Sequence, residues 1–92
     1  MPKFYTCKGW ETFQHYKRRN PPWIKLHRSL LDDYEFSSMS EKSRLHLVLI
    51  WLYASQNNGK VPNDKKFLER KLDIVDLDLE EIVSAGFLEV AK

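Results

Sequence analysis

Residues 40–90 carry three helical patterns of decreasing length, joined by short turns and followed by a short apolar strand. The first pattern ends at Asn57-Asn58-Gly59 and the third at Ala85-Gly86, where glycine permits the left-handed backbone that closes a helix. The strand is Phe87-Leu88-Glu89-Val90. This order predicts a winged helix-turn-helix, a mostly α-helical fold with a small β-sheet (α+β). Such a domain normally binds a nucleic acid or a protein and has no built-in catalytic chemistry.

Capping residues predict where these helices begin. The first helix is expected to start near Ser38 or Ser40, because Ser38-x-x-Glu41 has the spacing of a capping box. Asp64 is the expected cap of the second helix, and Asp78 is the expected cap of the third.

Apolar residues fall on two faces of the first helix. A helix of this kind is buried on both sides as the hub of the fold, or it gives one side to a homodimer. The interpretation leaves both arrangements open and predicts that Trp51 is buried. The faces are Leu45, Val48, Leu49 and Leu52 on one side and Leu47, Ile50, Trp51 and Ala54 on the other.

The amino-terminal part of the chain is basic. Residues 1–28 hold seven Lys or Arg against one Glu, a formal charge of +6, whereas the remainder holds eight against twelve, a charge of −4. Asn20-Pro21-Pro22 interrupts regular structure. We therefore expect a basic aromatic arm over residues 1–19, without an assigned helix or strand, and a winged-helix domain over residues 20–92. Cys7, the single cysteine, is expected to be an incidental thiol near a mobile end.

Residues 24–36 are expected to form two short elements. Alternation from Ile24 to His27 predicts a half-buried strand, and residues 29–36 predict one or two helical turns. Three side chains of these turns are expected to point inward: Leu30, Leu31 and Phe36.

The sequence does not favour an enzyme. It has no glycine-rich phosphate loop, and its three histidines are scattered without metal-ligand spacing, so we expect no cofactor and no metal. The longest apolar run, residues 47–54, is far shorter than the roughly 20 residues that cross a bilayer. No signal peptide is apparent, which favours the cytoplasm.

Cations in the arm and in the second helix are candidate DNA contacts. Clustered Lys and Arg beside aromatic side chains suit phosphate neutralisation and base stacking. A solvated basic surface without a ligand explains the same pattern equally well. The candidates are Lys17, Arg18, Arg19, Lys25, Arg28, Lys65, Lys66, Arg70 and Lys71.

The third helix is acidic. In a helix-turn-helix this helix would enter the major groove, but it exposes no Arg, Lys, Asn or Gln that could read a base. It therefore favours a basic protein partner, or DNA binding through other surfaces. The candidate protein contacts are Asp76, Asp78, Glu80 and Glu81.

Three segments carry a family resemblance. They are NPPWIKLHRSLLDDYEFSSMSEKSRLHLVLIWLYAS (residues 20–55), KVPNDKKFLERKLDI (60–74) and DLEEIVSAGFLEV (78–90). The stretch that they span is roughly four-fifths of the chain and resembles the amino-terminal winged-helix domain of phage and prophage replication proteins, the replisome-organiser and lambda O-like group. The resemblance implies binding to origin or replication-fork DNA. The alternative is a small phage regulator that uses the same fold to bind a host replication or defence protein.

Overall fold

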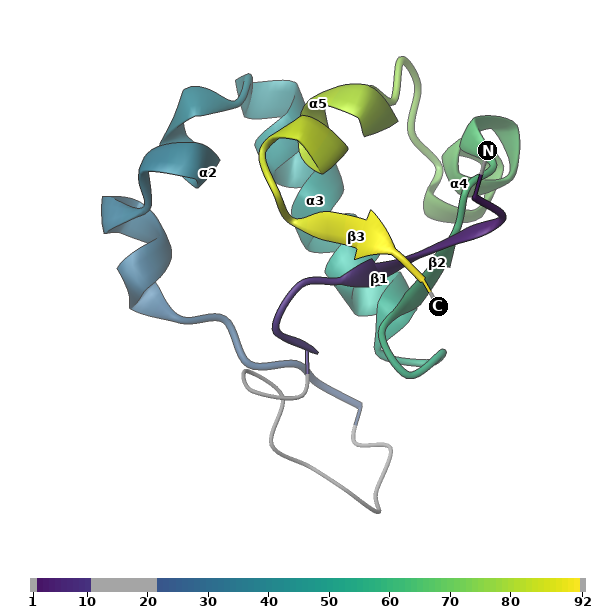
Figure 1. Ribbon diagram of the computed structural model, residues 1–92, viewed down its shortest axis with the longest axis horizontal. Coiled ribbons are helices and arrows are strands. Elements are labelled where there is room, and N and C mark those ends of the chain that lie inside the picture. Colours follow the sequence, from purple (N-terminus) through teal and green to yellow (C-terminus); the bar gives the residue numbers. More distant parts are fainter. Residues whose placement is uncertain (1, 11–21, 92) are drawn as a thin grey trace.

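The computed structural model describes residues 2–10 and 22–91 (Figure 1). These residues form an α+β fold, which confirms the coarse class expected from the sequence. Its elements are β1 (Phe4–Cys7), η1 (Arg28–Asp32), α2 (Tyr34–Ser38), α3 (Glu41–Ala54), β2 (Lys60–Pro62), α4 (Lys65–Leu72), α5 (Leu79–Ser84) and β3 (Leu88–Val90).

The described strands form one antiparallel sheet in the order β2-β1-β3. Tyr5 pairs with Val61 on one side and with Val90 on the other, so the amino-terminal strand is the central one. Cys7 is 3% exposed and belongs to the core, so the expectation of an incidental thiol near a mobile end is wrong. The structure thus places residues 4–7 in the sheet, although the sequence assigned no strand to the segment 1–19.

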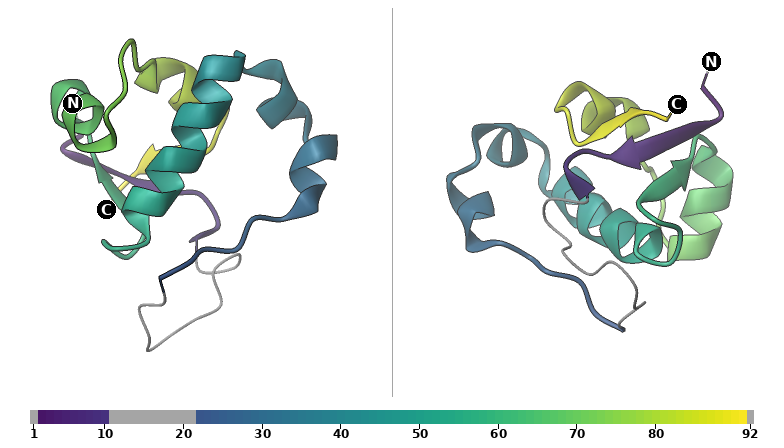
Figure 2. Two further views of the ribbon diagram at one scale, coloured as in Figure 1. Left: turned by 180° about the vertical axis from the view of Figure 1, so that it is seen from behind. Right: turned by 60° about the horizontal axis from the view of Figure 1, so that its bottom comes forward.

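Helix α3 crosses behind the sheet, and α4 and α5 pack against α3 (Figures 1 and 2). Ser40 caps α3, because the Ser40 hydroxyl oxygen accepts a hydrogen bond from the Ser43 backbone N–H at 3.1 Å. The other predicted start, Ser38, is wrong, since its hydroxyl donates to the Tyr34 carbonyl in the preceding helix. After α3, the chain reverses at Asn58 and Gly59, which both have positive φ.

The core is formed by side chains of the sheet and of helices α3, α4 and α5. Its central members are fully or almost fully buried, and they come from one face of α3 and from single positions of the neighbouring elements. They are Cys7, Met39, Leu47, Ile50, Ala54, Val61, Leu68, Leu77, Ile82 and Leu88.

One of the two faces of α3 that the sequence predicted to be buried is only partly buried. Trp51 is half-buried, and its ring meets Phe87 edge-to-face at 6.2 Å. On the other face, Leu45 is 58% and Leu52 is 44% exposed, so the part of the chain that the structure describes does not bury α3 on both sides.

The segment before α3 also departs from the sequence expectation. Residues 23–27 are not a strand, and Leu31 is 85% exposed instead of buried. Residues 28–38 form two short helices, as expected for part of this stretch, and Phe36 packs edge-to-face on Phe87 at 6.2 Å.

Candidate functional site

Helix α4 presents a basic face. Asp64 caps the helix as predicted, its carboxylate accepting from the Phe67 N–H at 3.0 Å, while buried Leu68 fixes the inward side. The ring of Phe67 meets Tyr53 of α3 at 6.1 Å and holds the two helices together. Four cations remain exposed on this eight-residue helix: Lys65, Lys66, Arg70 and Lys71.

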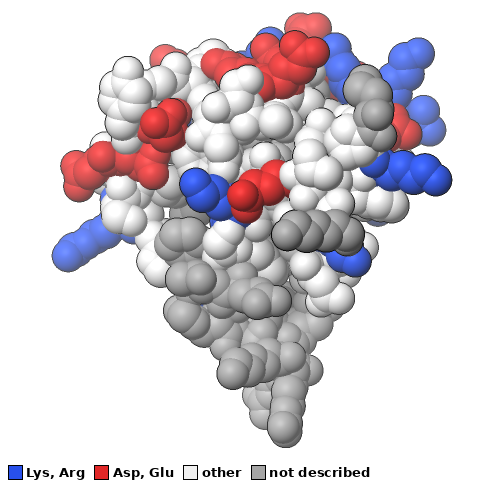
Figure 3. Space-filling view, viewed as in Figure 1, with Lys and Arg blue, Asp and Glu red and all other residues white. Residues whose placement is uncertain are grey.

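Two further lysines extend this basic surface toward the sheet. The Lys3 carbonyl accepts a hydrogen bond from the Asn63 N–H at 2.9 Å, which places Lys3 beside the turn that leads into α4. Lys60 lies on β2 opposite Thr6. Both lysine side chains are exposed. Figure 3 shows Lys and Arg gathered around the α4 end of this face of the molecule.

The remaining predicted cations do not all join this surface. Lys17, Arg18 and Arg19 lie outside the described residues. Arg28 is exposed and begins η1, on the opposite side of the molecule from α4 (Figure 1), while Lys25 is half-buried in the segment that precedes η1. The structure therefore groups the four cations of α4 and separates them from Lys25 and Arg28.

Glu81 of α5 forms hydrogen bonds to the start of α3. Its carboxylate accepts hydrogen bonds from the Ser40 N–H and the Ser40 hydroxyl, each at 3.0 Å, and another from the Ser43 hydroxyl. These bonds, first that from Ser43 and then that from the Ser40 backbone, lower the pKa of Glu81. Glu81 therefore ties α5 to the first turn of α3, and its expected role as a protein contact stays a prediction.

Of the other three predicted acids, one caps α5 and two are exposed. Asp78 caps α5 by accepting from the Glu81 N–H at 3.0 Å, as predicted. Asp76 and Glu80 are exposed, and neither side chain forms a hydrogen bond to another residue that the structure describes. Acidic side chains gather over α5 in Figure 3, away from the α4 end.

A buried histidine lies between α3, α4 and the loop that joins α4 to α5. His46 is 5% exposed, and burial, followed by the charge of Lys42, lowers its pKa, whereas Glu69 and Asp76 oppose this shift. Glu69 also accepts from the Leu77 N–H at 3.0 Å. Among the residues that the structure describes, no three His, Cys, Asp or Glu side chains are grouped to hold a metal ion.

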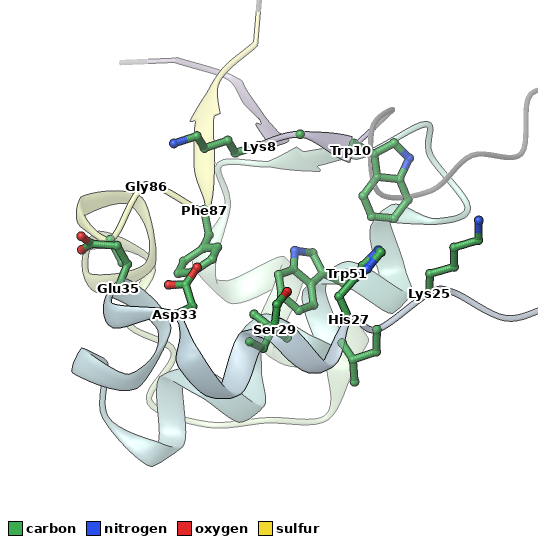
Figure 4. Close-up of a pocket in the computed structure, with 14 residues that line it drawn as sticks. Lys8, Trp10, Lys25, His27, Ser29, Asp33, Glu35, Trp51, Gly86 and Phe87 are labelled. Atoms are coloured by element: carbon green, nitrogen blue, oxygen red, sulfur yellow. The ribbon is translucent and has the colours of Figure 1, made fainter.

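A cavity of about 270 Å³ opens between the segment 25–35 and the body of the fold (Figure 4). Trp10, Trp51 and Phe87 supply aromatic walls, while Lys8 and Glu35 lie toward its edge (Figure 4). Such a cavity suits a small planar or apolar group. Sequence reasoning missed it because the walls come from four separate segments that only the tertiary fold brings together.

Comparison with known proteins gives no relative. No family model matches the chain, and neither a curated protein nor a solved structure matches it. In residues 2–10 and 22–91, no helix combines the length and the apolar character needed to span a membrane. The surfaces described above are therefore the basis for a functional argument.

Proposed function

We propose that the chain is a cytoplasmic, non-enzymatic DNA-binding module of the phage replication type, with a winged-helix fold. The observation that carries the proposal is the exposed basic face of α4. Four cations on one short helix provide the electrostatic footprint that a phosphate backbone requires.

The order of elements supports the winged-helix assignment. Helices α3, α4 and α5 occur in this order, with β2 between α3 and α4, and β3 is the next element after α5. In this assignment α4 is the first helix of the helix-turn-helix, the one that crosses the phosphate backbone. Strand β1 would then pair with the wing strand β3 from the amino-terminal side of the chain.

The charge of α5 defines the mode of binding. Its exposed positions, Glu80 and Ser84, offer no bidentate donor for a base edge, and Glu80 would repel phosphates. We therefore propose backbone binding through α4, with little direct reading of sequence. Three or four phosphate contacts predict a salt slope of about −3 to −4 in log K against log salt concentration.

A pair of matched double variants tests this assignment. Lys66→Ala with Arg70→Ala removes two cations from α4, whereas Lys8→Ala with Lys42→Ala removes two exposed cations elsewhere. Titration of labelled duplex and single-stranded DNA over a salt series should show a slope reduced by about 2 units for the first pair only. A triple alanine variant of Lys17, Arg18 and Arg19 measures the contribution of the expected arm. Equal losses in both double variants, or no binding at low salt, would overturn the proposal.

The exposed acids favour a second candidate function, a phage regulator that binds a basic host protein. Asp76 precedes α5 and Glu80 lies on it; both are exposed, and among the described residues neither side chain has a hydrogen-bond partner, unlike Asp78 and Glu81. Asp76→Asn with Glu80→Gln should weaken capture of such a partner from host lysate and leave DNA binding nearly unchanged. Unchanged capture by this variant would count against the regulator.

A further inference from the structure

The cavity between the segment 25–35 and the body of the fold has the features of a ligand site. Three aromatic side chains line it from separate parts of the chain: Trp10, Trp51 and Phe87 (Figure 4). The rings of Trp51 and Phe87 lie 6.2 Å apart at an interplanar angle of 76°, so they form adjoining walls instead of stacking on each other. A flat ring that stacks on one of them can meet the other edge-to-face, and both arrangements are favourable between aromatic groups.

The volume of the cavity indicates a ligand of two fused rings. An engineered apolar cavity of about 150 Å³ holds one benzene ring. This cavity measures about 270 Å³, which is just below the roughly 300 Å³ at which sites for drug-sized ligands begin. A single six-membered ring would therefore leave part of the space unfilled, and the cavity is smaller than the sites that hold larger molecules.

Three lining residues carry polar groups that a ligand would remove from water. Neither the Trp51 indole N–H nor the Ser29 hydroxyl forms a hydrogen bond to another residue that the structure describes. The Asp33 carboxylate accepts from the Phe36 N–H through Oδ1 at 2.9 Å, and Oδ2 has no such bond within the described part of the chain. A purely apolar ligand would bury these groups unpaired, which is costly. The ligand should therefore carry both hydrogen-bond donors and acceptors on the edge of its rings.

The charges around the cavity favour a ring without net charge. Lysines and acidic residues line it in equal number, Lys8 and Lys25 against Asp33 and Glu35. A cationic or an anionic ring would be attracted by one of these pairs and repelled by the other.

We propose that this cavity binds a purine base. A purine is a flat, uncharged pair of fused rings with donors and acceptors on its edge, and bases stack readily on aromatic side chains. A free purine nucleoside and an unpaired purine of a single-stranded nucleic acid share this chemistry. None of the described residues that line the cavity belongs to α4, so the proposal goes beyond DNA-backbone binding and does not rest on it.

Isothermal titration calorimetry of the full chain with adenosine and guanosine tests the proposal. At least one nucleoside should bind, and Ser29→Trp, whose larger side chain occupies the cavity, should weaken this binding by about tenfold or more. Leu31→Trp is the matched control on η1, because Leu31 is 85% exposed and does not line the cavity, and it should bind as wild type does. Thermal melts verify that both variants are folded. No binding of either nucleoside, or undiminished binding by Ser29→Trp, would overturn the proposal.

A second pair of variants tests the hydrogen bond from the indole. Trp51→Phe keeps an aromatic wall but removes the N–H, and it should weaken purine binding about three- to tenfold. Trp23→Phe makes the same change at a residue that does not line the cavity, and it should have no effect. N-acetyltryptophanamide, a two-ring probe for an aromatic side chain of a protein, should bind more weakly than the purine. Tighter binding of this probe, or unchanged purine affinity in Trp51→Phe, would overturn the assignment to a purine.

Competition separates the two sources of the base. The experiment uses Lys66→Ala with Arg70→Ala, which should bind the nucleoside as wild type does, so that loss of DNA binding through α4 does not affect the result. A short single-stranded oligonucleotide of the same base should displace the nucleoside if the site takes an unpaired base, and should leave it bound if the site takes a free nucleoside. Loss of nucleoside binding in this α4 variant would place the ligand on α4 and overturn the proposal.

Discussion

The indole of Trp10 lies against the Cα of Gly59, and a β-carbon at residue 59 would come within 2.7 Å of Trp10 Cγ. Gly59 also has a φ of 79°, a backbone conformation that other residues rarely adopt. Its carbonyl accepts from the Cys7 N–H and its N–H donates to the Ala54 carbonyl, each at 2.9 Å. Gly59 therefore joins the end of α3 to the central strand, and it does so under two separate constraints.

Gly59→Ala should destabilise the protein more than Gly86→Ala. Gly86 has a similar φ of 91°, but a β-carbon there would meet no atom within 4 Å, so it carries the backbone cost alone, about 1–2 kcal/mol. At residue 59, displacement of the indole adds about 1–3 kcal/mol. Urea unfolding of both variants measures the difference. Equal losses would show that the contact with Trp10 costs nothing to disturb.

Glu81→Gln should lower the melting temperature, and Glu80→Gln should not. Both residues lie on α5, but only Glu81 accepts hydrogen bonds from Ser40 and Ser43 at the start of α3. Charge-assisted bonds of this kind are stronger than those to a neutral amide. Thermal unfolding followed by circular dichroism provides the test, and Ser43→Ala should reproduce part of the loss. Identical melting of the two glutamine variants would refute the structural role of Glu81.

The free energy of unfolding should fall in two steps as the pH is lowered. Burial lowers the pKa of His46, so its contribution is present above the ordinary value of 6.5 and is lost as the pH falls through the lowered pKa of the folded state. The pKa of Glu81 is lowered from 4.5, so its contribution is likewise present above 4.5 and is lost below it. Urea titrations from pH 8 to pH 3 measure both steps. Glu81→Gln should remove the lower step and keep the upper one.

The helices could be predicted because their signals are local. Asp64 and Asp78 each bond to a backbone N–H three residues later, so spacing alone revealed the caps of α4 and α5. The helical period likewise predicted that the four cations of α4 are exposed. The sequence left Ser38 and Ser40 open as the start of α3, because the two serines have similar local sequence; the structure selects Ser40, whose hydroxyl also donates to Glu81.

The features that the sequence did not predict depend on distant parts of the chain. Strand β1 exists through pairing with residues 60–62 and 88–90, which no local pattern of residues 4–7 reveals. Glu81 seemed a surface acid because its partners lie about 40 positions earlier in the chain. Leu31 seemed a core residue because its apolar side chain says nothing about which face of a short helix is covered. Hydrophobic pattern fixes a periodicity, whereas tertiary packing decides which face is buried.

Cys7 should be inert in the folded protein. Its side chain is 3% exposed, and burial raises the pKa of its thiol from 9.0 to about 12. The thiolate is the reactive form, so at pH 8 the shift alone reduces its population about a thousandfold, before restricted access is considered. Alkylation should therefore proceed only through unfolding, and its rate should rise with urea in parallel with the unfolded fraction.

A second cysteine gives the internal standard for this measurement. In Leu31→Cys the new thiol occupies a position that is 85% exposed, and it should react at the rate of a free thiol while Cys7 of the same molecule does not. Mass spectrometry after a short pulse of iodoacetamide separates singly from doubly labelled chains. Because Cys7 lies in the central strand opposite Leu88, its protection reports directly on whether the amino-terminal strand is part of the folded sheet. Rapid double labelling in the absence of urea would contradict both the burial of Cys7 and the central place of β1.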